Sequence, residues 1–417
     1  MELILALISV PSLAALVLLV VRKDGIRDVV AIVSAAAIAV LSILFAVRFL
    51  GPQATVMSLP DQFGPVLSGI NLIIDLVVMG FIIAYALRYK RMLALALAVI
   101  QLAGLVWFEF AVGHSMAYSS QMRVDTLTVI MVLIIGIVGT GICVYALGYM
   151  KDFQEHESGK DRRPWFFAIM FAFLSAMYNI VVMDNLVWVY TAWEVTTLCS
   201  FLLIGFTKTE EAINNAFRQI VMNMLGGIAF QAALLYLGLK GLPLIFSEFL
   251  ALGSEVVGLV ALPVALFAFA GITKAAQMPF HTWLLGAMVA PTPTSALLHS
   301  STMVKAGVFL LVKLSPMFLM LPAASFMVIM VGGITFALCS FMAISQSNAK
   351  RVLAYSTVAN LGLIVACAGV GTPEAVWAAI FLIIFHAVAK SLLFLCVGTA
   401  EHHIGSRSTA CPVLPDS

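Results

Sequence analysis

Two lysines and two histidines interrupt a segment, Ala270–Gly307, whose other residues are almost all apolar, small or hydroxyl-bearing. They are Lys274, His281, His299 and Lys305. In a bilayer, a charged side chain costs from about 2.5 kcal/mol to well over 10 kcal/mol, so such residues normally face a bundle interior or a wet cavity. Amines and imidazoles in that setting can take up and release protons. We therefore interpret the four residues as stations for protons, His281 being the weakest member because it can lie near a surface.

A carboxylic acid and a lysine form the first candidate pair. Glu194 lies about halfway along the apolar segment Asn185–Phe206, too far from either end for its side chain to reach water. Lys274 precedes Pro279, where a helix is expected to break. The alternatives are structural: a neutral Glu194 that hydrogen-bonds between helices, and a Lys274 that extends from a helix end to the surface.

A second pair lies in Phe381–Gly398. His386 and Lys390 are four residues apart, so they share one face of a helix and can form adjacent proton-exchanging groups. His299 and Lys305 are six residues apart, and at about 100° per residue they face different sides of a straight helix. We expect them to contact different neighbours, with a packing role as the alternative for His299.

Other kinds of chemistry find little support. The six cysteines show no CxxC spacing, and neither a glycine-rich dinucleotide motif nor a phosphate-binding loop appears, so we expect no metal and no cofactor in this chain. The net charge of +2 gives no electrostatic case for nucleic acid. Two further acids within apolar segments, Asp75 and Glu109, are interpreted as packing or partner contacts.

The elements that must position these residues are membrane helices. The chain is 63% hydrophobic and 10% charged, whereas soluble domains are about 45–50% apolar and about 25% charged. The mean hydropathy is +1.10, and many apolar runs reach the roughly 20 residues that cross a bilayer. We predict an all-α, polytopic bundle with spans at 2–21, 28–50, 66–87, 91–113, 124–150, 164–182, 185–206, 212–239, 255–289, 293–315, 321–345, 349–370 and 375–399. The first is expected to be a retained helix because it lacks a basic leader.

The ninth predicted span, 255–289, is too long for one straight crossing. It contains Pro263 and Pro279, and a proline inside a helix removes a hydrogen bond and clashes with the preceding turn. We expect both prolines to interrupt it. Backbone opened in this way must be buried in protein or line a cavity.

The basic residues predict the orientation of the bundle. With the N-terminus placed outside, four of the 22 lysines and arginines fall at external ends and three fall within spans, Lys274, Lys305 and Lys390. This bias fits the positive-inside rule and predicts a multi-pass protein of the cell inner (plasma) membrane with an external N-terminus. The other fifteen fall at internal loops: Arg22, Lys23, Arg27, Arg88, Lys90, Arg91, Lys151, Lys160, Arg162, Arg163, Lys208, Arg218, Lys350, Arg351 and Arg407.

Three long motifs resemble one family of membrane proteins. They are Trp193–Phe206 (WEVTTLCSFLLIGF), Gly271–Gly307 and Phe385–Gly398 (FHAVAKSLLFLCVG), and the resemblance extends over about 124–405. The family comprises the antiporter-like subunits of respiratory complex I, of Mrp-type cation/proton antiporters and of membrane-bound energy-converting hydrogenases. The resemblance implies that Glu194 is the acidic partner of Lys274, that His299 and Lys305 continue the path, and that His386 and Lys390 lie on the central connecting helix.

The resemblance also implies an architecture of two inverted five-helix repeats, each with a broken helix. We expect N-terminal helices at 1–123, a first half with a broken helix at 124–320, the start of a second half at 321–405 and an atypical tail at 406–417. Four predicted spans precede Val124, whereas complex I subunits usually have two in this region. The longer N-terminal region is more similar to that of hydrogenase-linked members. The broken helix that the resemblance implies for the second repeat is missing. A truncation, a frameshift or a split subunit would explain this.

The expected function is a redox-inactive, proton-translocating subunit of a complex I-like oxidoreductase complex, with a hydrogenase or related ferredoxin-driven complex preferred to an NADH dehydrogenase. Its partners would be other membrane subunits and, through them, iron–sulfur or hydrogenase subunits. The alternative is a subunit of an Mrp-type sodium/proton antiporter. A third hypothesis, of another class, is a structural membrane anchor whose polar residues only lock helices together.

Overall fold

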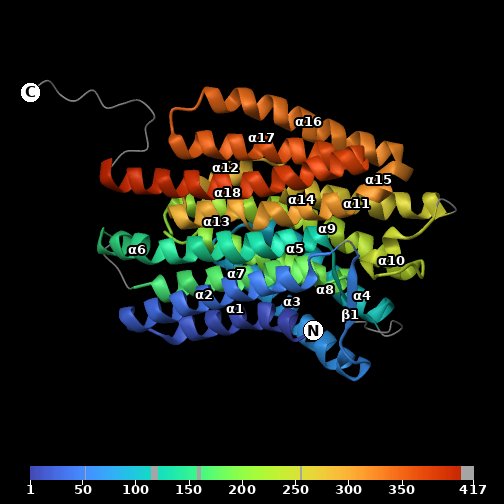
Figure 1. Ribbon diagram of the computed structural model, residues 1–417, viewed down its shortest axis with the longest axis horizontal. Coiled ribbons are helices and arrows are strands. Elements are labelled where there is room, and N and C mark those ends of the chain that lie inside the picture. The colour runs from blue at the N-terminus through green and yellow to red at the C-terminus, as the bar shows by residue number, and fades with distance from the viewer. Residues whose placement is uncertain (52, 114–120, 157–160, 254–255, 405–417) are drawn as a thin grey trace, which may run out of the picture.

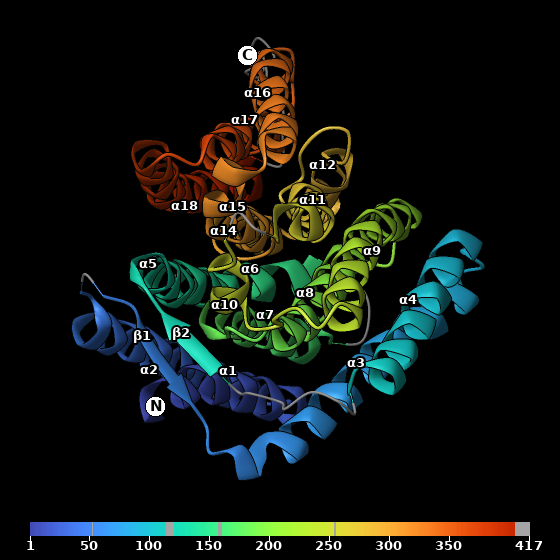
Figure 2. The ribbon, with the colours of Figure 1, turned by 90° about the vertical axis from the view of Figure 1, so that its right-hand side faces the viewer.

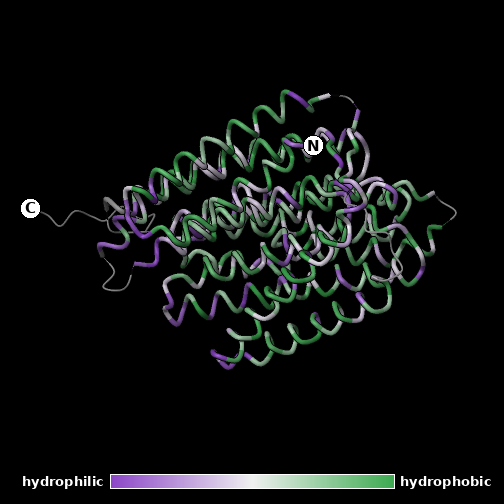
Figure 3. Tube along the Cα trace, turned by 90° about the horizontal axis from the view of Figure 1, so that it is seen from below, coloured by the Kyte–Doolittle hydropathy of each residue, from purple (hydrophilic) through white to green (hydrophobic). Residues whose placement is uncertain are grey.

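The computed structural model describes residues 1–51, 53–113, 121–156, 161–253 and 256–404. Within these residues, 13 helical segments are long and apolar enough to cross a membrane, which confirms the predicted polytopic helical bundle. The helices run side by side along one direction (Figure 1). Hydrophobic residues dominate their shafts, and hydrophilic residues gather mainly at the two ends of the bundle (Figure 3). The predicted atypical tail, 406–417, lies outside the described residues.

The described residues of the first part of the chain contain ten helical segments, a 3-10 turn η1 (Asp61–Phe63) and two short strands. Helices α5 and α6 form one crossing through a π-helical segment, η3. The bounds are α1 (Glu2–Val20), α2 (Asp24–Phe49), β1 (Thr55–Ser58), α3 (Gly64–Arg88), α4 (Met92–Ala111), β2 (Gln121–Val124), α5 (Thr126–Leu133), η3 (Ile134–Gly139), α6 (Thr140–His156), α7 (Arg163–Val182), α8 (Leu186–Ile204) and α9 (Glu210–Leu239).

The second part contains the broken helices and three long helices at the end of the described chain. Its bounds are α10 (Phe246–Leu250), α11 (Val257–Lys274), α12 (Thr282–Gly286), the 3-10 turn η5 (Ala287–Val289), α13 (Thr292–Ser300), α14 (Met303–Lys313), α15 (Ser315–Met320), α16 (Pro322–Ile344), α17 (Ala349–Val370) and α18 (Pro373–Ile404).

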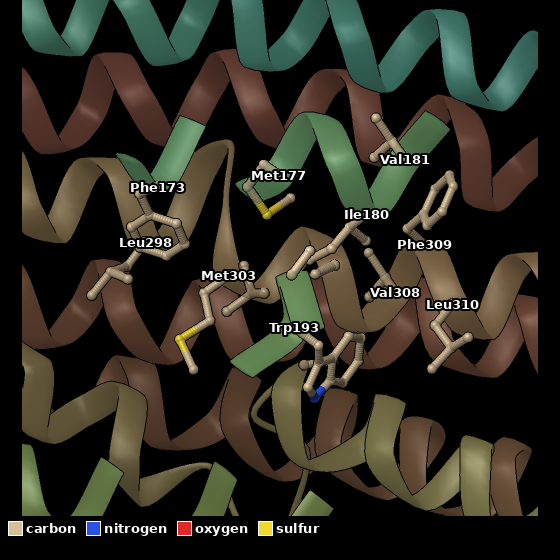
Figure 4. Close-up of a cluster of buried hydrophobic side chains, with 14 of the residues drawn as sticks. Phe173, Met177, Ile180, Val181, Trp193, Leu298, Met303, Val308, Phe309 and Leu310 are labelled. Atoms are coloured by element: carbon tan, nitrogen blue, oxygen red, sulfur yellow. The ribbon is translucent and has the colours of Figure 1, made fainter. Parts of the chain in front are cut away.

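Burial within the chain separates central helices from peripheral ones. The most apolar window of α13–α14 is 100% buried and that of α7 is 83% buried, whereas that of α1 is only 33% buried. Large apolar side chains of α7, α8, α13 and α14 interlock at the centre, as Figure 4 shows for Met177, Trp193, Leu298 and Phe309. The peripheral helices expose apolar faces, as expected of helices that face lipid or other subunits.

A helical hairpin, α3–α4, lies in the sequence between two strands that pair with each other. Strands β1 and β2 are antiparallel, with Thr55 opposite Val124 and Ser58 opposite Gln121. The hairpin extends sideways from these strands and covers one side of the bundle (Figure 2). Helix α3 packs on α8, and α4 packs on α9. The hairpin therefore adds one helix against α8, the helix that carries Glu194, and one against α9.

An ion pair ties α5 to α14 at the end of the bundle where the N-terminus lies. Asp125 caps α5 by accepting a 3.0 Å hydrogen bond from the Thr128 backbone N–H, and it pairs with Lys313. Burial works to raise the pKa of Asp125, but the Lys313 ammonium and the two Thr128 hydrogen bonds outweigh it and hold that pKa below its usual range. The carboxylate is therefore charged at neutral pH and fixes the start of α5 against α14.

The structure corrects two expectations about helix breaks. Pro263 lies inside α11 without ending it, because transmembrane helices tolerate the loss of one backbone hydrogen bond when neighbouring groups compensate. The predicted span 293–315 is not continuous: α13 ends at Ser300 and α14 begins at Met303. At this break the Thr302 hydroxyl donates a 2.9 Å hydrogen bond to the Leu297 carbonyl, so a side chain replaces part of the helical bonding.

Candidate functional site

Glu194 lies buried in the middle of α8, a helix whose start is fixed by the Asn185 side chain, which accepts a 2.9 Å hydrogen bond from the Val187 N–H. Neither carboxylate oxygen of Glu194 accepts a hydrogen bond from a described residue within ordinary geometry. Gly227 of α9 makes the space for this carboxylate, because a Cβ atom there would overlap Glu194 Oε1. The carboxylate thus occupies a pocket that depends on close approach of two helices.

Lys274 is the last residue of α11 and is fully buried. Its ammonium donates hydrogen bonds to the Trp193 carbonyl, at 2.6 Å, and to the Thr197 hydroxyl, at 2.9 Å. It also lies 4.5 Å from the centre of the Trp193 ring, within the range of a cation–π contact. Lys274 therefore contacts the residue directly before Glu194 without bonding to the Glu194 carboxylate.

Helix α11 ends at Lys274. The helix is therefore interrupted before Pro279, as predicted. Ala276 has a φ of 52°, in the left-handed region, and the Met278–Pro279 peptide is cis. The opened backbone is satisfied within the protein: Gln277 N–H donates to the Ile272 carbonyl at 3.0 Å, and Met278 N–H donates to the Thr335 hydroxyl at 3.1 Å. The break places the Lys274 ammonium at a helix C-terminus, where the helix dipole favours a cation.

A second carboxylate joins this site from the α3–α4 hairpin. Asp75 of α3 is 2% exposed and accepts a 2.7 Å hydrogen bond from the Thr191 hydroxyl, one turn before Glu194 on α8. Gln101 of α4 donates a 2.7 Å hydrogen bond to the Tyr190 hydroxyl. One carboxylate oxygen of Asp75 and the side-chain amide oxygen of Gln101 (Oε1) accept no hydrogen bond from a described residue.

From the sequence, Asp75 was expected to make packing or partner contacts. It is the only acidic residue in the predicted span 66–87, which marks it as a buried charge but does not indicate its neighbours. The sequence carries no signal that brings α3 against α8, since that contact depends on how the inserted hairpin folds back.

A second lysine site pairs Lys305 with His386. The Lys305 ammonium on α14 lies 3.0 Å from His386 Nδ1 and 3.2 Å from the Ile383 carbonyl on α18. When Lys305 is charged it can only donate, so His386 Nδ1 must be the acceptor and the ring proton must sit on Nε2. Lys390, on the same face of α18, donates instead to the Ser356 hydroxyl of α17 at 2.6 Å.

His299 and Lys305 contact different residues, as expected, but not because they lie on different sides of one straight helix. The break at 301–302 separates them, so the angle along one straight helix does not apply. The His299 ring is fully buried, lies 4.6 Å from the Phe394 ring centre and has no hydrogen-bond partner among the described residues. His281 is half-buried at the start of α12, with its ring centre 6.5 Å from that of Tyr355.

The structure thus gathers the candidate residues into two clusters. One contains Asp75, Glu194 and Lys274, and the other contains His299, Lys305, His386 and Lys390; His281 belongs to neither. The clusters meet where α11 packs on α14, because a Cβ atom at Gly307 would lie 2.5 Å from the Ala275 backbone nitrogen. Buried polar atoms without protein partners, such as both His299 nitrogens and Ser301 Oγ, occur in this region. Such atoms are suited to hydrogen-bonding water.

The arrangement is suited to moving protons and unsuited to binding a transition metal. Among the described residues, no group of three or more His, Cys, Asp or Glu side chains is placed to hold a metal ion. Amines, imidazoles and carboxylates within reach of hydroxyls and backbone carbonyls can instead pass protons between neighbours.

Comparisons with known proteins agree with this description. A model of the transmembrane region of the NADH:quinone oxidoreductase/Mrp antiporter family matches residues 183–410, and a model of the N-terminus of complex I chain 5 matches residues 107–162. NAD(P)H-quinone oxidoreductase subunit 5 from chloroplasts of Gossypium barbadense is 36% identical over 310 residues, which are 71% of this chain and 40% of that protein. The counterpart from Piper cenocladum is 34% identical over 340 residues, 78% of this chain and 44% of that protein.

Solved structures show the same fold. A chain of the Mrp complex from Dietzia sp. DQ12-45-1b is 28% identical with a TM-score of 0.75, covering 100% of this chain and 39% of that chain. A chain of an archaeal membrane-bound sulfane sulfur reductase is similar in fold, with a TM-score of 0.73 at 16% identity over 98% of this chain and 73% of that chain. The chain spans about two fifths of the length of the curated relatives it matches. From the two family models and these relatives, the chain belongs to the NADH:quinone oxidoreductase/Mrp antiporter family of polytopic membrane subunits.

Proposed function

We propose that this chain is a proton-translocating membrane subunit of a larger, complex I-like assembly. The observation that carries the proposal is the fully buried Lys274 ammonium, held at a helix break by the backbone and hydroxyl of the helix that bears Glu194. A lysine in this position can release its proton when its surroundings change, and the nearby carboxylate can take one up. In the proposal Glu194, Lys274, His299, Lys305, His386 and Lys390 exchange protons, Asp75 joins them, and His281 has a lesser part.

Redox chemistry is assigned to partner subunits. Each charge moved against 100 mV requires about 2.3 kcal/mol, so translocation must be driven by a reaction elsewhere in the assembly. Within this class we propose a ferredoxin-driven respiratory complex such as a membrane-bound energy-converting hydrogenase, with iron–sulfur subunits as partners. The support is the pair of additional helices before Val124 and the similar fold of a chain in an archaeal respiratory complex.

A second candidate is a subunit of an Mrp-type sodium/proton antiporter. It is favoured by a specific observation: the chain of the Dietzia Mrp complex matches this chain along its whole length, the α3–α4 hairpin included. In that case no redox partner exists, and sodium moves in exchange for protons.

One experiment separates the two candidates. The native assembly is purified through a tag on this chain, its subunits are identified by mass spectrometry, and it is reconstituted into vesicles that contain pH-sensitive and sodium-sensitive dyes. Co-purifying iron–sulfur subunits and a reductant-driven pH change support the first candidate. A sodium gradient that drives proton movement without reductant supports the second. An assembly that moves neither ion under either condition contradicts the proposed function.

The proposed orientation gives a prediction for labelling. With Cys396, which is exposed, and Cys411 both replaced by Ser, we introduce Lys151→Cys at the internal end of α6 or Lys240→Cys at the external end of α9. A membrane-impermeant maleimide added to intact cells should label the Lys240→Cys variant and not the Lys151→Cys variant. The reason is that the loops with most of the lysines and arginines are expected on the inner side of the membrane. The opposite pattern would invert the proposed topology, and permeabilised cells, in which both variants react, provide the control.

A further inference from the structure

A large cavity opens between the α3–α4 hairpin and the rest of the bundle, away from the proton-exchanging clusters. Its volume is about 1080 Å³, which exceeds the roughly 300–1,000 Å³ of ordinary small-molecule pockets. It lies at the end of the bundle that carries the basic loops, since Arg22, Arg162 and Lys208 all line it. These residues follow α1, precede α7 and follow α8, respectively.

The cavity exists because two helices part from each other. Helix α1 packs on α2 and α7, whereas α3 packs on α4 and α8. Leu19 of α1, Phe81 of α3 and Trp165 of α7 line the cavity and are 37%, 43% and 53% exposed. Its mouth is therefore apolar and opens sideways, toward the bilayer, as a lipid-binding cavity requires.

The inner wall is apolar and built from aromatic rings. Tyr85 and Tyr89 stack with their ring centres 6.3 Å apart, and each makes an edge contact, Tyr85 with Phe201 and Tyr89 with Phe217. Phe201 and Phe217 in turn lie 5.2 Å apart. Tyrosine and tryptophan are enriched at the level of lipid head groups, so these rings mark the polar boundary of the membrane.

The end of the cavity beyond this boundary is positively charged. Arg162 is fixed by a 2.6 Å hydrogen bond to the Phe206 carbonyl, and Arg22 and Lys208 are exposed at the rim. Asp161, the one acidic lining residue among those that the structure describes, already accepts hydrogen bonds from Arg163 and lies 3.5 Å from Arg27. Burial works to raise the pKa of Asp161, but the Arg163 hydrogen bonds outweigh it and keep that pKa below its usual range.

Asp161 is therefore a carboxylate already paired with Arg163 and Arg27, whereas the rim of the cavity carries the exposed cations Arg22 and Lys208. An apolar cavity that opens to the bilayer and ends in basic groups is complementary to a molecule with a hydrocarbon body and an anionic head. We propose that the cavity binds one anionic phospholipid, with its phosphate at Arg22 and Lys208 and an acyl chain against Phe81, Ile169 and Leu202.

A lipid so placed fills the space between α1 and α3 and braces the hairpin against the bundle. A soluble anion would leave the apolar walls without contacts. A helix of a neighbouring subunit would bury the basic rim without neutralising it, which is costly.

The test uses the intact assembly, purified from vesicles of equal phosphatidylglycerol and phosphatidylcholine. Native mass spectrometry measures the ratio of the two lipids retained. The variant Arg22→Gln with Lys208→Gln leaves the Arg162 contact to Phe206 in place. Each basic residue near a membrane surface favours anionic lipid by roughly fivefold, so the double variant should lower the retained ratio by about 25-fold.

The matched control, Lys151→Gln with Arg351→Gln, removes the same charge from exposed internal positions outside the cavity and should leave the ratio unchanged. A third variant, Leu202→Trp, fills the cavity without altering charge and should also expel the lipid. Unchanged retention in the Arg22/Lys208 variant overturns the proposal, and so does an equal loss in the control. A structure of the assembly with a protein helix in the cavity overturns it as well.

Discussion

Glu194→Gln and Lys274→Ala will each reduce proton translocation by about tenfold or more, because a positioned proton-transfer group contributes roughly 10²–10⁴-fold to the step it serves. When the Lys274 ammonium is near, it favours the charged carboxylate of Glu194, and when the two move apart the neutral form of each is favoured. The double variant should lose little beyond either single variant, since the two residues act as a unit. The measurement is the rate of acidification of inverted vesicles that contain equal amounts of assembled complex.

The control for this pair is Lys240→Ala, which removes an exposed lysine at the end of α9 and should translocate protons at the parent rate. Asp75→Asn preserves the shape of the side chain and its contact with Thr191 while removing its charge. If Asp75 exchanges protons with Glu194, this variant should also slow translocation. Losses at Glu194 and Lys274 that multiply in the double variant would show that the two residues act separately.

Lys305→Met and Lys390→Ala should each also cut translocation by about tenfold or more while the complex still assembles, since each removes an ammonium from the second cluster. The structure separates the two lysines by their partners: Lys305 contacts His386, and Lys390 contacts Ser356. Thermal stability of the purified complex should reveal this difference. Residues in contact couple by about 0.5–3 kcal/mol, whereas independent sites add within about 0.3–0.5 kcal/mol.

The stability cycle therefore compares two double variants. His386→Gln combined with Lys305→Met should be less destabilising than the sum of the single changes, and Lys390→Ala combined with Lys305→Met should be close to additive. Coupling of Lys305 to Lys390 and not to His386 would contradict the observed geometry. If all the variants assemble and translocate at the parent rate, the second cluster has only a structural role.

Much of the fold could be predicted because a bilayer imposes simple requirements on sequence. All thirteen spans were predicted from apolar runs, since every crossing must satisfy its backbone within one helix. Glu194 and Lys274 could be selected as charged residues within apolar segments, although for Lys274 an extension of the side chain to the surface remained the alternative. The break near Pro279 followed from the length of the segment and the missing N–H of proline.

The parts that could not be predicted depend on contacts between segments. Pro263 was expected to end a helix, but its effect depends on what surrounds the opened turn, and α11 continues through it. The break at 301–302 contains no proline. Its only signal is the run of polar residues from His299 to Thr302, whose hydroxyls compete for backbone carbonyls. His386 was paired with Lys390 by spacing along one helix, whereas its contact with Lys305 comes from a different helix.

The position of the α3–α4 hairpin has a consequence for how the subunit is made. Glu194 is fully buried within this single chain, and the hairpin supplies the side chains of Asp75 and Gln101 that lie beside it. A freshly inserted copy would therefore not present the Glu194 carboxylate to lipid tails.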